Sequence, residues 1–371
     1  MTDLDEQFMA EALKLAGLGR GCVEPNPMVG AMLVRDGSVL GQGYHRALGG
    51  PHAEVEAIRS ARSGGHDVRG ATLYVSLEPC CHTGQTPPCT DAILEAGLAR
   101  VVGAMQDVDP RVAGKGYQIL RDAGLEVRDG VLAEQARELL AGYIKLRTRG
   151  RPWVICKWAQ TPGGLLALPA GAGRWVSCPA SLEYSHHLRS ICDGICIGIG
   201  TLLSDDPLLT NRKGSGRQPV RIVLDSRLQT PPGCQLVRTA REHPALIATT
   251  SVALEAQSAK ARELRQAGVE LLELPAGEGG LDLGAMLDEL GRRQHTYLMV
   301  EGGPAVLGSF VYGGLADELL AFVCPAHVSY DLAGDAMPRF DIAQVAAKLN
   351  LDAPRKQAFG PDLLWRYVLT K

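Results

Sequence analysis

Residues 72–89 read TLYVSLEPCCHTGQTPPC, an apolar strand-like run that passes into a loop rich in proline, glycine and threonine. The loop carries Cys80, Cys81 and Cys89, and its composition excludes a core strand. Four of the ten cysteines lie instead in or beside apolar runs, where packing explains them: Cys156, Cys192, Cys196 and Cys324. We therefore look for chemistry in residues 80–89.

A histidine and a glutamate stand upstream of this loop, in the segment GPHAE of residues 50–54. His52, Cys80 and Cys89 form a ligand set that suits zinc, and three protein ligands leave the fourth tetrahedral position open to water. Zinc lowers the pKa of such a water to about 7, so hydroxide is available at neutral pH. Glu54 would then carry protons, as the corresponding glutamate does in zinc-dependent base deaminases.

The place of His52 and Glu54 at the start of a predicted helix, residues 53–62, makes mechanical sense. Side chains two positions apart in a helix interior point to nearly opposite sides. In the first turn, however, both can flank a site that lies beyond the helix end. A structural zinc site is the alternative, in which Cys81 and His82 would help to close the coordination shell.

Strands and helices alternate on both sides of this segment. In the first half, helices are predicted at 8–16, 53–62, 89–96 and 133–145, and strands at 30–34, 72–77 and 101–105. In the second half, strands are predicted at 153–158, 194–199, 220–224, 245–249, 297–300 and 319–323, with helices at 181–190 and 255–267 between them. This alternation predicts layered α/β domains with mostly parallel sheets.

The length of 371 residues favours two domains. The charged stretch 147–152, RTRGRP, is typical of a linker, so we expect one domain at 1–146 and another at 152–371. With 46% hydrophobic and 21% charged residues the chain is globular, and its net charge of −3 argues against nucleic acid as a partner. No apolar run of about twenty residues predicts a membrane span, and the acidic N-terminus lacks a signal core. We expect a cytoplasmic protein.

The quoted motif strongly resembles the deaminase motif of the family of bifunctional riboflavin-biosynthesis enzymes, and PNPMVG at 25–30 and GPHAE at 50–54 resemble two further segments of that family. The resemblance implies an N-terminal cytidine-deaminase-like three-layer α/β/α domain. It also implies that Asn26 and His82 contact the pyrimidine or its ribose phosphate. Cys81 stands where the family commonly has serine, and Gln85 where it has a basic residue. His45 and His66 each stand alone near glycines, and we assign them no role.

The second half resembles the same family's reductase domain, an α/β relative of dihydrofolate reductase that uses NADPH. The resemblance rests on KWA at 157–159, RWVS at 174–177, GIGTLLSDDPLLTNR at 198–212 and VEGGP at 300–304. By position, the residues implied to serve the cofactor are Ala159, Trp175, Thr201, Asp205, Gly302 and Gly303. Those implied to face the substrate are Lys157, Arg212 and Glu301. Independently of the resemblance, glycines that follow a strand and precede a helix offer backbone N–H groups to a phosphate.

Three departures concern this reductase domain. Gly163 and Leu182 occupy positions that are usually charged in the family, and a glycine that usually follows Pro325 is missing. The resemblance implies zinc-dependent deamination of 2,5-diamino-6-(ribosylamino)-4(3H)-pyrimidinone 5′-phosphate, followed by NADPH reduction of the ribosyl side chain to ribityl. We also expect a homo-oligomer. The alternatives are a deaminase whose second domain is a scaffold and, more distantly, a nucleic-acid base deaminase.

Overall fold

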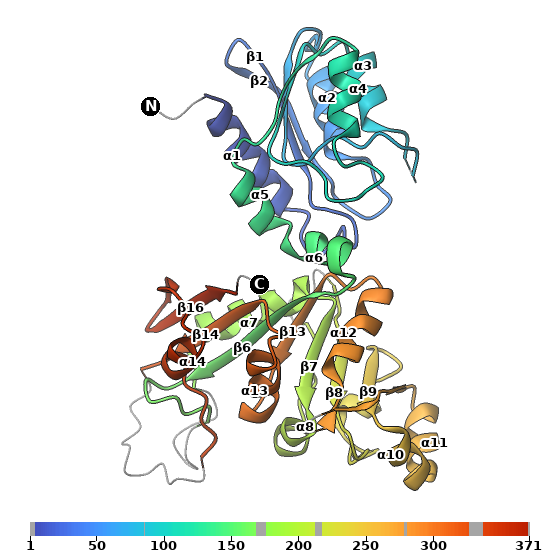
Figure 1. The fold of residues 1–371 in the computed structure, drawn as a ribbon, viewed down its shortest axis with the longest axis vertical. Coiled ribbons are helices and arrows are strands. Elements are labelled where there is room, and N and C mark those ends of the chain that lie inside the picture. Colours follow the sequence, from blue (N-terminus) through green and yellow to red (C-terminus); the bar gives the residue numbers. More distant parts are fainter. Residues whose placement is uncertain are drawn as a thin grey trace. The chain divides into compact units, whose positions relative to one another are not determined.

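The computed structural model describes residues 4–84, 86–167, 176–211, 217–277, 280–325 and 337–369. The chain divides into two compact units, Met1–Gly150 and Arg151–Lys371 (Figure 1). The stretch expected to be a linker is helical as far as Arg149, and Tyr143 of the same helix packs into the core of the first unit. Gly150, with φ at +64°, ends that helix.

The first unit is built on a five-stranded sheet in the order β2-β1-β3-β4-β5. Its strands are β1 (Gly30–Arg35), β2 (Ser38–Tyr44), β3 (Thr72–Val75), β4 (Arg100–Gly103) and β5 (Glu126–Arg128). Its helices are α1 (Leu4–Gly17), α2 (Ala53–Ser63), α3 (Cys89–Glu95), α4 (Lys115–Asp122), α5 (Ala133–Leu139) and α6 (Ala141–Arg149). The sheet is less parallel than predicted, because β1 pairs antiparallel with both β2 and β3. Asp36 and Gly37, both with positive φ, form the tight turn between β1 and β2.

Helices cover both faces of this sheet, so the unit has three layers (Figure 1). Met32 and Val34 of β1 pack with α1 and α5, whereas Ala31 and Leu33 pack with α2, α3 and α4. This alternation is the two-residue period of a strand that is buried on both faces. Helix α2 approaches β2 closely, since a Cβ atom on Gly41 would lie 2.5 Å from the carbonyl oxygen of Ala57. The small residue therefore fixes where α2, and the residues at its start, lie against the sheet.

The second unit is built on a nine-stranded sheet in the order β10-β9-β8-β7-β13-β6-β14-β16-β15, with a two-stranded sheet of β11 and β12 beside it. The strands are β6 (Trp153–Gln160), β7 (Gly194–Gly198), β8 (Val220–Leu224), β9 (Ala245–Thr249), β10 (Glu270–Glu273), β11 (Ala276–Gly277), β12 (Gly280–Leu281), β13 (Tyr297–Glu301), β14 (Glu318–Val323), β15 (Arg355–Phe359) and β16 (Asp362–Val368). The helices are α7 (Pro179–Ile191), α8 (Ile199–Asp205), α9 (Gln235–Arg238), α10 (Ser251–Ala256), α11 (Ser258–Gln266), α12 (Leu283–Arg292), α13 (Pro304–Tyr312) and α14 (Ile342–Lys348).

The large sheet is parallel from β10 to β14 and ends in an antiparallel hairpin of β16 and β15. Helices α7 to α11 contribute to the core on one face, and α12, α13 and α14 to the core on the other. Strands β7, β13 and β6 are neighbours and run parallel, so their carboxyl ends meet at one edge of the sheet. In open α/β sheets ligands bind beyond this edge.

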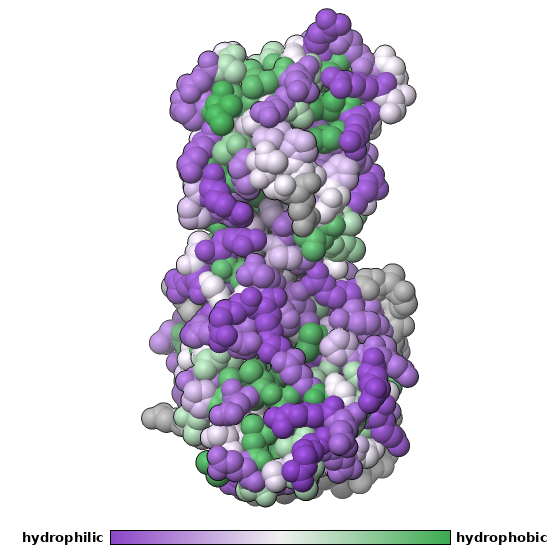
Figure 2. Space-filling view, turned by 90° about the vertical axis from the view of Figure 1, so that its right-hand side faces the viewer, coloured by the Kyte–Doolittle hydropathy of each residue, from purple (hydrophilic) through white to green (hydrophobic). Residues whose placement is uncertain are grey.

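The surface in Figure 2 is mainly hydrophilic, and its apolar side chains form separate patches. The large apolar side chains that are most exposed are Leu4, Leu18 and Val252, which are far apart in the sequence. Among the residues that the structure describes, no helix has both the length and the apolar character that crossing a membrane requires.

Candidate functional site

One histidine and two cysteines of the first unit bring their donor atoms together. Nδ1 of His52 lies 3.2 Å from Sγ of Cys89 and 3.5 Å from Sγ of Cys80. One ligand atom from each residue lies within 4.8 Å of the others, a spacing that can hold a metal ion. Two sulfurs and one imidazole nitrogen suit zinc, and three protein donors leave the fourth tetrahedral position for water. The donor set therefore fits an open zinc site.

Three separate elements supply these donors. His52 is the residue before α2 and has extended backbone angles, so Glu54 lies in the first helical turn, as the sequence predicted. Cys80 follows β3, and Cys89 is the first residue of α3. The backbone N–H of Cys89 donates to Sγ of Cys80 at 3.4 Å, which ties the two ends of the cysteine loop together.

Burial and mutual hydrogen bonding shift the ionisation of this group. The pKa of Cys80 is lowered to about 4, chiefly because the Cys89 thiol and His52 donate hydrogen bonds to its sulfur. The pKa of His52 is raised by the hydrogen bond to Cys80. Burial raises the pKa of Glu54 to about 7, and the negative charge of Cys80 adds to that effect. Glu54 can therefore both accept and donate a proton near neutral pH.

Two further side chains contact His52. Oγ1 of Thr86 lies 3.2 Å from Nε2 of His52, on the ring nitrogen that does not face the sulfurs. His45, to which the sequence assigned no role, is buried with its ring edge-on to His52 at 5.4 Å between centroids. Its Nδ1 lies 3.0 Å from the carbonyl oxygen of Pro51. No local signal marks His45, because it comes to the site from the end of β2 rather than from the zinc motifs.

The remaining residues predicted for this site differ in their placement. Cys81 donates from Sγ to the carbonyl oxygen of Arg111 at 3.8 Å and does not belong to the group of three donors. His82 is partly buried, and among the residues that the structure describes its Nδ1 has no hydrogen-bond partner. Asn26 lies in a turn, where its N–H donates to the carbonyl of Val23, and within the described chain its side chain makes no hydrogen bond to the donor group.

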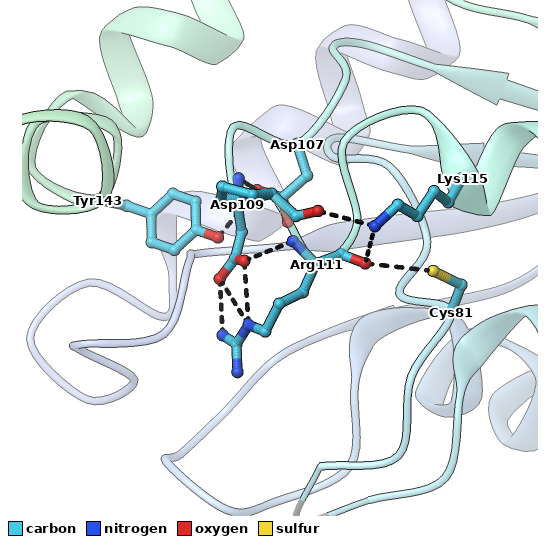
Figure 3. A network of polar contacts seen from close by, with 7 residues as sticks. Cys81, Asp107, Asp109, Arg111, Lys115 and Tyr143 are labelled. Atoms are coloured by element: carbon cyan, nitrogen blue, oxygen red, sulfur yellow. Dashed lines mark hydrogen bonds and ion pairs between the residues drawn. The ribbon is translucent and has the colours of Figure 1, made fainter.

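An arch of residues 107–115 lies beside Cys81 (Figure 3). Oδ1 of Asp107 accepts hydrogen bonds from the Tyr143 hydroxyl and from the N–H of Asp109, both at 2.9 Å. Asp109 binds the guanidinium of Arg111 through both carboxylate oxygens. Lys115 donates from Nζ to the carbonyl of Pro110 at 2.9 Å and to that of Arg111 at 3.4 Å. The arch therefore presents cationic side chains near the cysteine loop.

The second unit holds a half-buried cluster of charges toward the edge where β6, β13 and β7 end. Glu301 and Lys157 are register partners on β13 and β6, and their Oε1 and Nζ atoms lie 3.5 Å apart. Arg189 of α7 donates from Nη2 to Oε2 of Glu301 at 2.7 Å. Burial lowers the pKa of Lys157, whereas Arg189 and Lys157 hold the pKa of Glu301 below its usual value although burial opposes this. Arg189, which the sequence left unassigned, thus belongs to this cluster.

The glycines predicted to bind a cofactor lie at the same edge. Gly302 has φ at +153°, and a Cβ atom there would lie 3.4 Å from Oγ1 of Thr201. Gly303 caps α13, and a Cβ atom on it would meet nothing within 4 Å. The backbone N–H groups at the start of α13 are therefore open to the approach of a phosphate group. Ala159 lies near the end of β6, as register partner of Phe322 on β14.

Some predicted residues of this site are not brought into it. Asp205 ends α8 with an exposed side chain that accepts a hydrogen bond from Ser204. Trp175 and Arg212 lie outside the described residues. Gly163, at a usually charged position, accepts a hydrogen bond from Arg339 through its carbonyl.

Comparisons with known proteins agree with both units. Residues 2–105 match the cytidine and deoxycytidylate deaminase zinc-binding region, and residues 152–364 match the RibD C-terminal domain. The riboflavin biosynthesis protein RibD of Aquifex aeolicus is 39% identical over 364 residues, which cover 98% of each chain. The RibD protein of Escherichia coli is 38% identical over 343 residues, covering 89% of this chain and 90% of the relative.

Solved structures resemble the whole chain. Acinetobacter baumannii RibD has a TM-score of 0.82 and 31% identity, with 99% of each chain covered. A diaminohydroxyphosphoribosylaminopyrimidine deaminase/5-amino-6-(5-phosphoribosylamino)uracil reductase from Thermotoga maritima has a TM-score of 0.84 and 33% identity, again with 99% of each chain covered. These matches confirm the predicted fold class, a cytidine-deaminase-like domain followed by one like dihydrofolate reductase. The chain therefore belongs to the RibD family of riboflavin biosynthesis proteins, which joins a zinc-dependent deaminase to a reductase that uses a nicotinamide cofactor.

Proposed function

We propose that residues 1–146 hydrolyse the 2-amino group of 2,5-diamino-6-(ribosylamino)-4(3H)-pyrimidinone 5′-phosphate, and that residues 152–371 then reduce the sugar with NADPH. The name of the Thermotoga maritima protein, which this chain resembles over 99% of its length, supports this order of substrates. In the first step water replaces the amino group, which leaves as ammonia. In the second, a hydride and a proton convert the ribosyl group to ribityl.

The observation that carries the first step is the buried carboxylate of Glu54 beside the three donors. We propose that His52, Cys80 and Cys89 hold zinc, which supplies a water molecule with its pKa lowered to about 7. Glu54 would accept a proton from water at this site and deliver it to the departing amino group. Its burial, at 3% exposure, raises its pKa to about 7, which suits a group that must both take up and release a proton at neutral pH.

The substrate of this step would be held by Asn26 and His82. The free Nδ1 of His82 supports its part, because a buried ring nitrogen without a partner in the protein can bond a ligand. We assign these two residues to the pyrimidine or to its ribose phosphate. His45, buried against His52, helps to shape the same pocket wall.

For the second step we propose that the start of α13, with Gly302 and Gly303, binds the diphosphate of NADPH. Ala159, Trp175, Thr201 and Asp205 would complete the cofactor site. Lys157, Arg212 and Glu301 would face the sugar, where opening of the ring needs a proton at the ring oxygen as the hydride reaches carbon. Lys157 would give that proton, and the contacts of Glu301 with Lys157 and Arg189 support this proposal because they hold the Lys157 side chain in place.

In this proposal the protein binds a small phosphorylated pyrimidine and no nucleic acid. It acts as a homo-oligomer, and it is located in the cytoplasm. All ten cysteines are free thiols, which fits a reducing compartment. The net charge of −3 gives little attraction to a phosphate backbone.

A two-stage assay tests both steps. The zinc-loaded protein is given the diaminopyrimidine and ammonia is measured, and NADPH is then added and its oxidation followed. We expect ammonia release without NADPH, and NADPH oxidation that depends on prior deamination. Ammonia release with no NADPH oxidation would favour the deaminase whose second unit is a scaffold, a reading that the uncharged Gly163 and Leu182 motivate.

A further inference from the structure

Glu78, two residues before the proposed zinc ligand Cys80, is a buried carboxylate held by backbone N–H groups. Its Oε2 accepts hydrogen bonds from the N–H groups of Asp107 at 3.1 Å and Gly114 at 2.8 Å. Its Oε1 accepts from Gly116 at 2.8 Å and from Tyr117 at 3.3 Å. The residue is 3% exposed, and in the described part of the chain no Lys or Arg forms an ion pair with it.

The segment around Glu78 is fixed from several sides. A Cβ atom on Gly116 would lie 2.1 Å from the carbonyl oxygen of Pro79, so the start of α4 touches the backbone just before Cys80. The N–H of Glu78 donates to the carbonyl of Met105 at 3.0 Å, and the carbonyl of Cys80 accepts from the N–H of Thr90 at 3.2 Å. Backbone groups of Glu78 and of Cys80 itself are therefore held by hydrogen bonds.

The same carboxylate also places the arch of residues 107–115. Two of its four donors, Asp107 and Gly114, lie near the two ends of that arch. Inside the arch, the carbonyl of Arg111 lies 3.8 Å from Sγ of Cys81 (Figure 3). Glu78 thus joins the segment that leads into the cysteine loop to the arch, through its bonds to Asp107 and Gly114.

The geometry points to Glu78 as a positioning residue that holds Cys80 in place for zinc and sets the arch beside the cysteine loop. It acts through Cys80 and is not one of the three grouped donors. Each of its two carboxylate oxygens accepts two of the four N–H groups, whereas the side-chain amide of glutamine has a single accepting oxygen. This inference rests on the proposed zinc-dependent deamination.

The test compares Glu78→Gln and Gly116→Ala with the unaltered chain. Glutamine keeps the volume but turns an N–H₂ group toward two of the four donors. The alanine methyl would lie 2.1 Å from the carbonyl oxygen of Pro79 and 3.2 Å from Oε1 of Glu78, so this variant displaces the segment without removing the carboxylate. Zinc affinity is measured by competition with a chelator, and the ligand geometry by the absorption bands of Co²⁺ bound in place of zinc. We expect the dissociation constant for zinc to rise about 10- to 100-fold in both variants, with shifted Co²⁺ bands.

Asp225 provides a matched control in the second unit. It is a fully buried carboxylate that accepts hydrogen bonds from the N–H groups of Gln229 at 2.8 Å and Thr230 at 2.7 Å. Asp225→Asn should lower stability and leave zinc affinity and the Co²⁺ bands unchanged. In the Glu78 and Gly116 variants, NADPH oxidation with the deaminated substrate is measured as a check that the second unit is folded.

Unchanged zinc affinity and unchanged Co²⁺ bands in Glu78→Gln would overturn the inference. If that variant does not fold, Gly116→Ala decides, because a wild-type zinc affinity there shows that the Pro79–Cys80 segment needs no such placement. An unaltered protein that binds no zinc would overturn the proposed function, and this inference with it.

Discussion

Thr86 and His52 are joined at the imidazole nitrogen that turns away from the two sulfurs: Oγ1 of Thr86 lies 3.2 Å from Nε2 of His52. The other nitrogen, Nδ1, faces Cys80 and Cys89. A histidine that binds a metal through one nitrogen usually donates its other N–H to a protein group, and this bond fixes the ring. Thr86, in the loop between the two cysteines, is therefore positioned to accept this hydrogen bond from His52.

Replacing Thr86 by valine, which has the same shape without the hydroxyl, should weaken zinc binding about 10- to 100-fold. The expected cause is an imidazole that is no longer held with Nδ1 toward the sulfurs. Thr86→Ser keeps the hydroxyl and should bind zinc like the unaltered protein. Chelator competition measures both, and equal affinity in the valine variant would show that the bond to His52 has no such role.

Gly302→Ala should raise the KM for NADPH and leave ammonia release unchanged. The φ of +153° at Gly302 strains any residue with a Cβ atom, and that atom would press on Thr201. Strain of about 1–3 kcal/mol corresponds to a KM increase of about 5- to 150-fold. Gly233→Ala is the control, because a Cβ atom at Gly233 meets nothing within 4 Å and needs no unusual φ. If Gly302→Ala had the same KM for NADPH as Gly233→Ala, the proposed phosphate site would be contradicted.

Arg189→Met should reduce the NADPH-dependent step without altering deamination. The substitution removes the 2.7 Å bond to Glu301, a charge-assisted contact worth about 1.5–3 kcal/mol, so kcat/KM for reduction should fall about 10- to 100-fold. Arg293→Met removes a comparable contact, the 2.6 Å bond to Glu270, away from the charged cluster. Reduction at the normal rate in Arg189→Met would show that Arg189 has no role in the reductase site.

Acid should destabilise the first unit between about pH 4 and pH 2 through Asp5. The Arg100 guanidinium, with help from Tyr74 and Arg128, lowers the pKa of Asp5 from 3.8 to about 2. A carboxyl whose pKa is lower in the folded protein stabilises it above its unfolded pKa. That contribution, about 2 kcal/mol for this shift, is lost as the pH falls through the folded value.

Asp5→Asn should therefore unfold more readily at neutral pH and show a smaller loss of stability across this pH window. Urea unfolding followed by far-ultraviolet circular dichroism measures the effect. Fluorescence reports the second unit separately, because all four tryptophans lie in residues 151–371. If the Asp5→Asn variant lost stability with pH just as the unaltered protein does, Asp5 would not be the source of the acid-dependent loss of stability.

The local part of the zinc site could be predicted, because its signals lie within short segments. The GPHAE segment predicts a helix that starts after His52, and the structure places His52 outside α2 and Glu54 in its first turn. The contacts that cross the fold left no such signal. Glu301 and Arg189 are 112 residues apart in the chain, and His45 meets His52 only because β2 ends beside the start of α2.

Some elements were hidden for a different reason. The hairpin of β15 and β16 was not predicted, because β15 reads RKQAF and four of its five residues are exposed. An exposed edge strand lacks the apolar alternation on which strand prediction depends. The helix predicted at 255–267 divides into α10 and α11 at Gln257, where the backbone leaves the helical region.

The central claim is that Glu54 moves the proton in a zinc-dependent deamination, and Glu54→Gln tests it most directly. The measurement is the rate of ammonia release at equal zinc content, with Glu56→Gln, from the same first turn of α2, as the matched control. We predict that Glu54→Gln loses about 10²- to 10⁴-fold in kcat while it keeps its zinc and its NADPH-dependent activity on the deaminated substrate. Ammonia release by Glu54→Gln at the rate of the Glu56→Gln control would contradict the account.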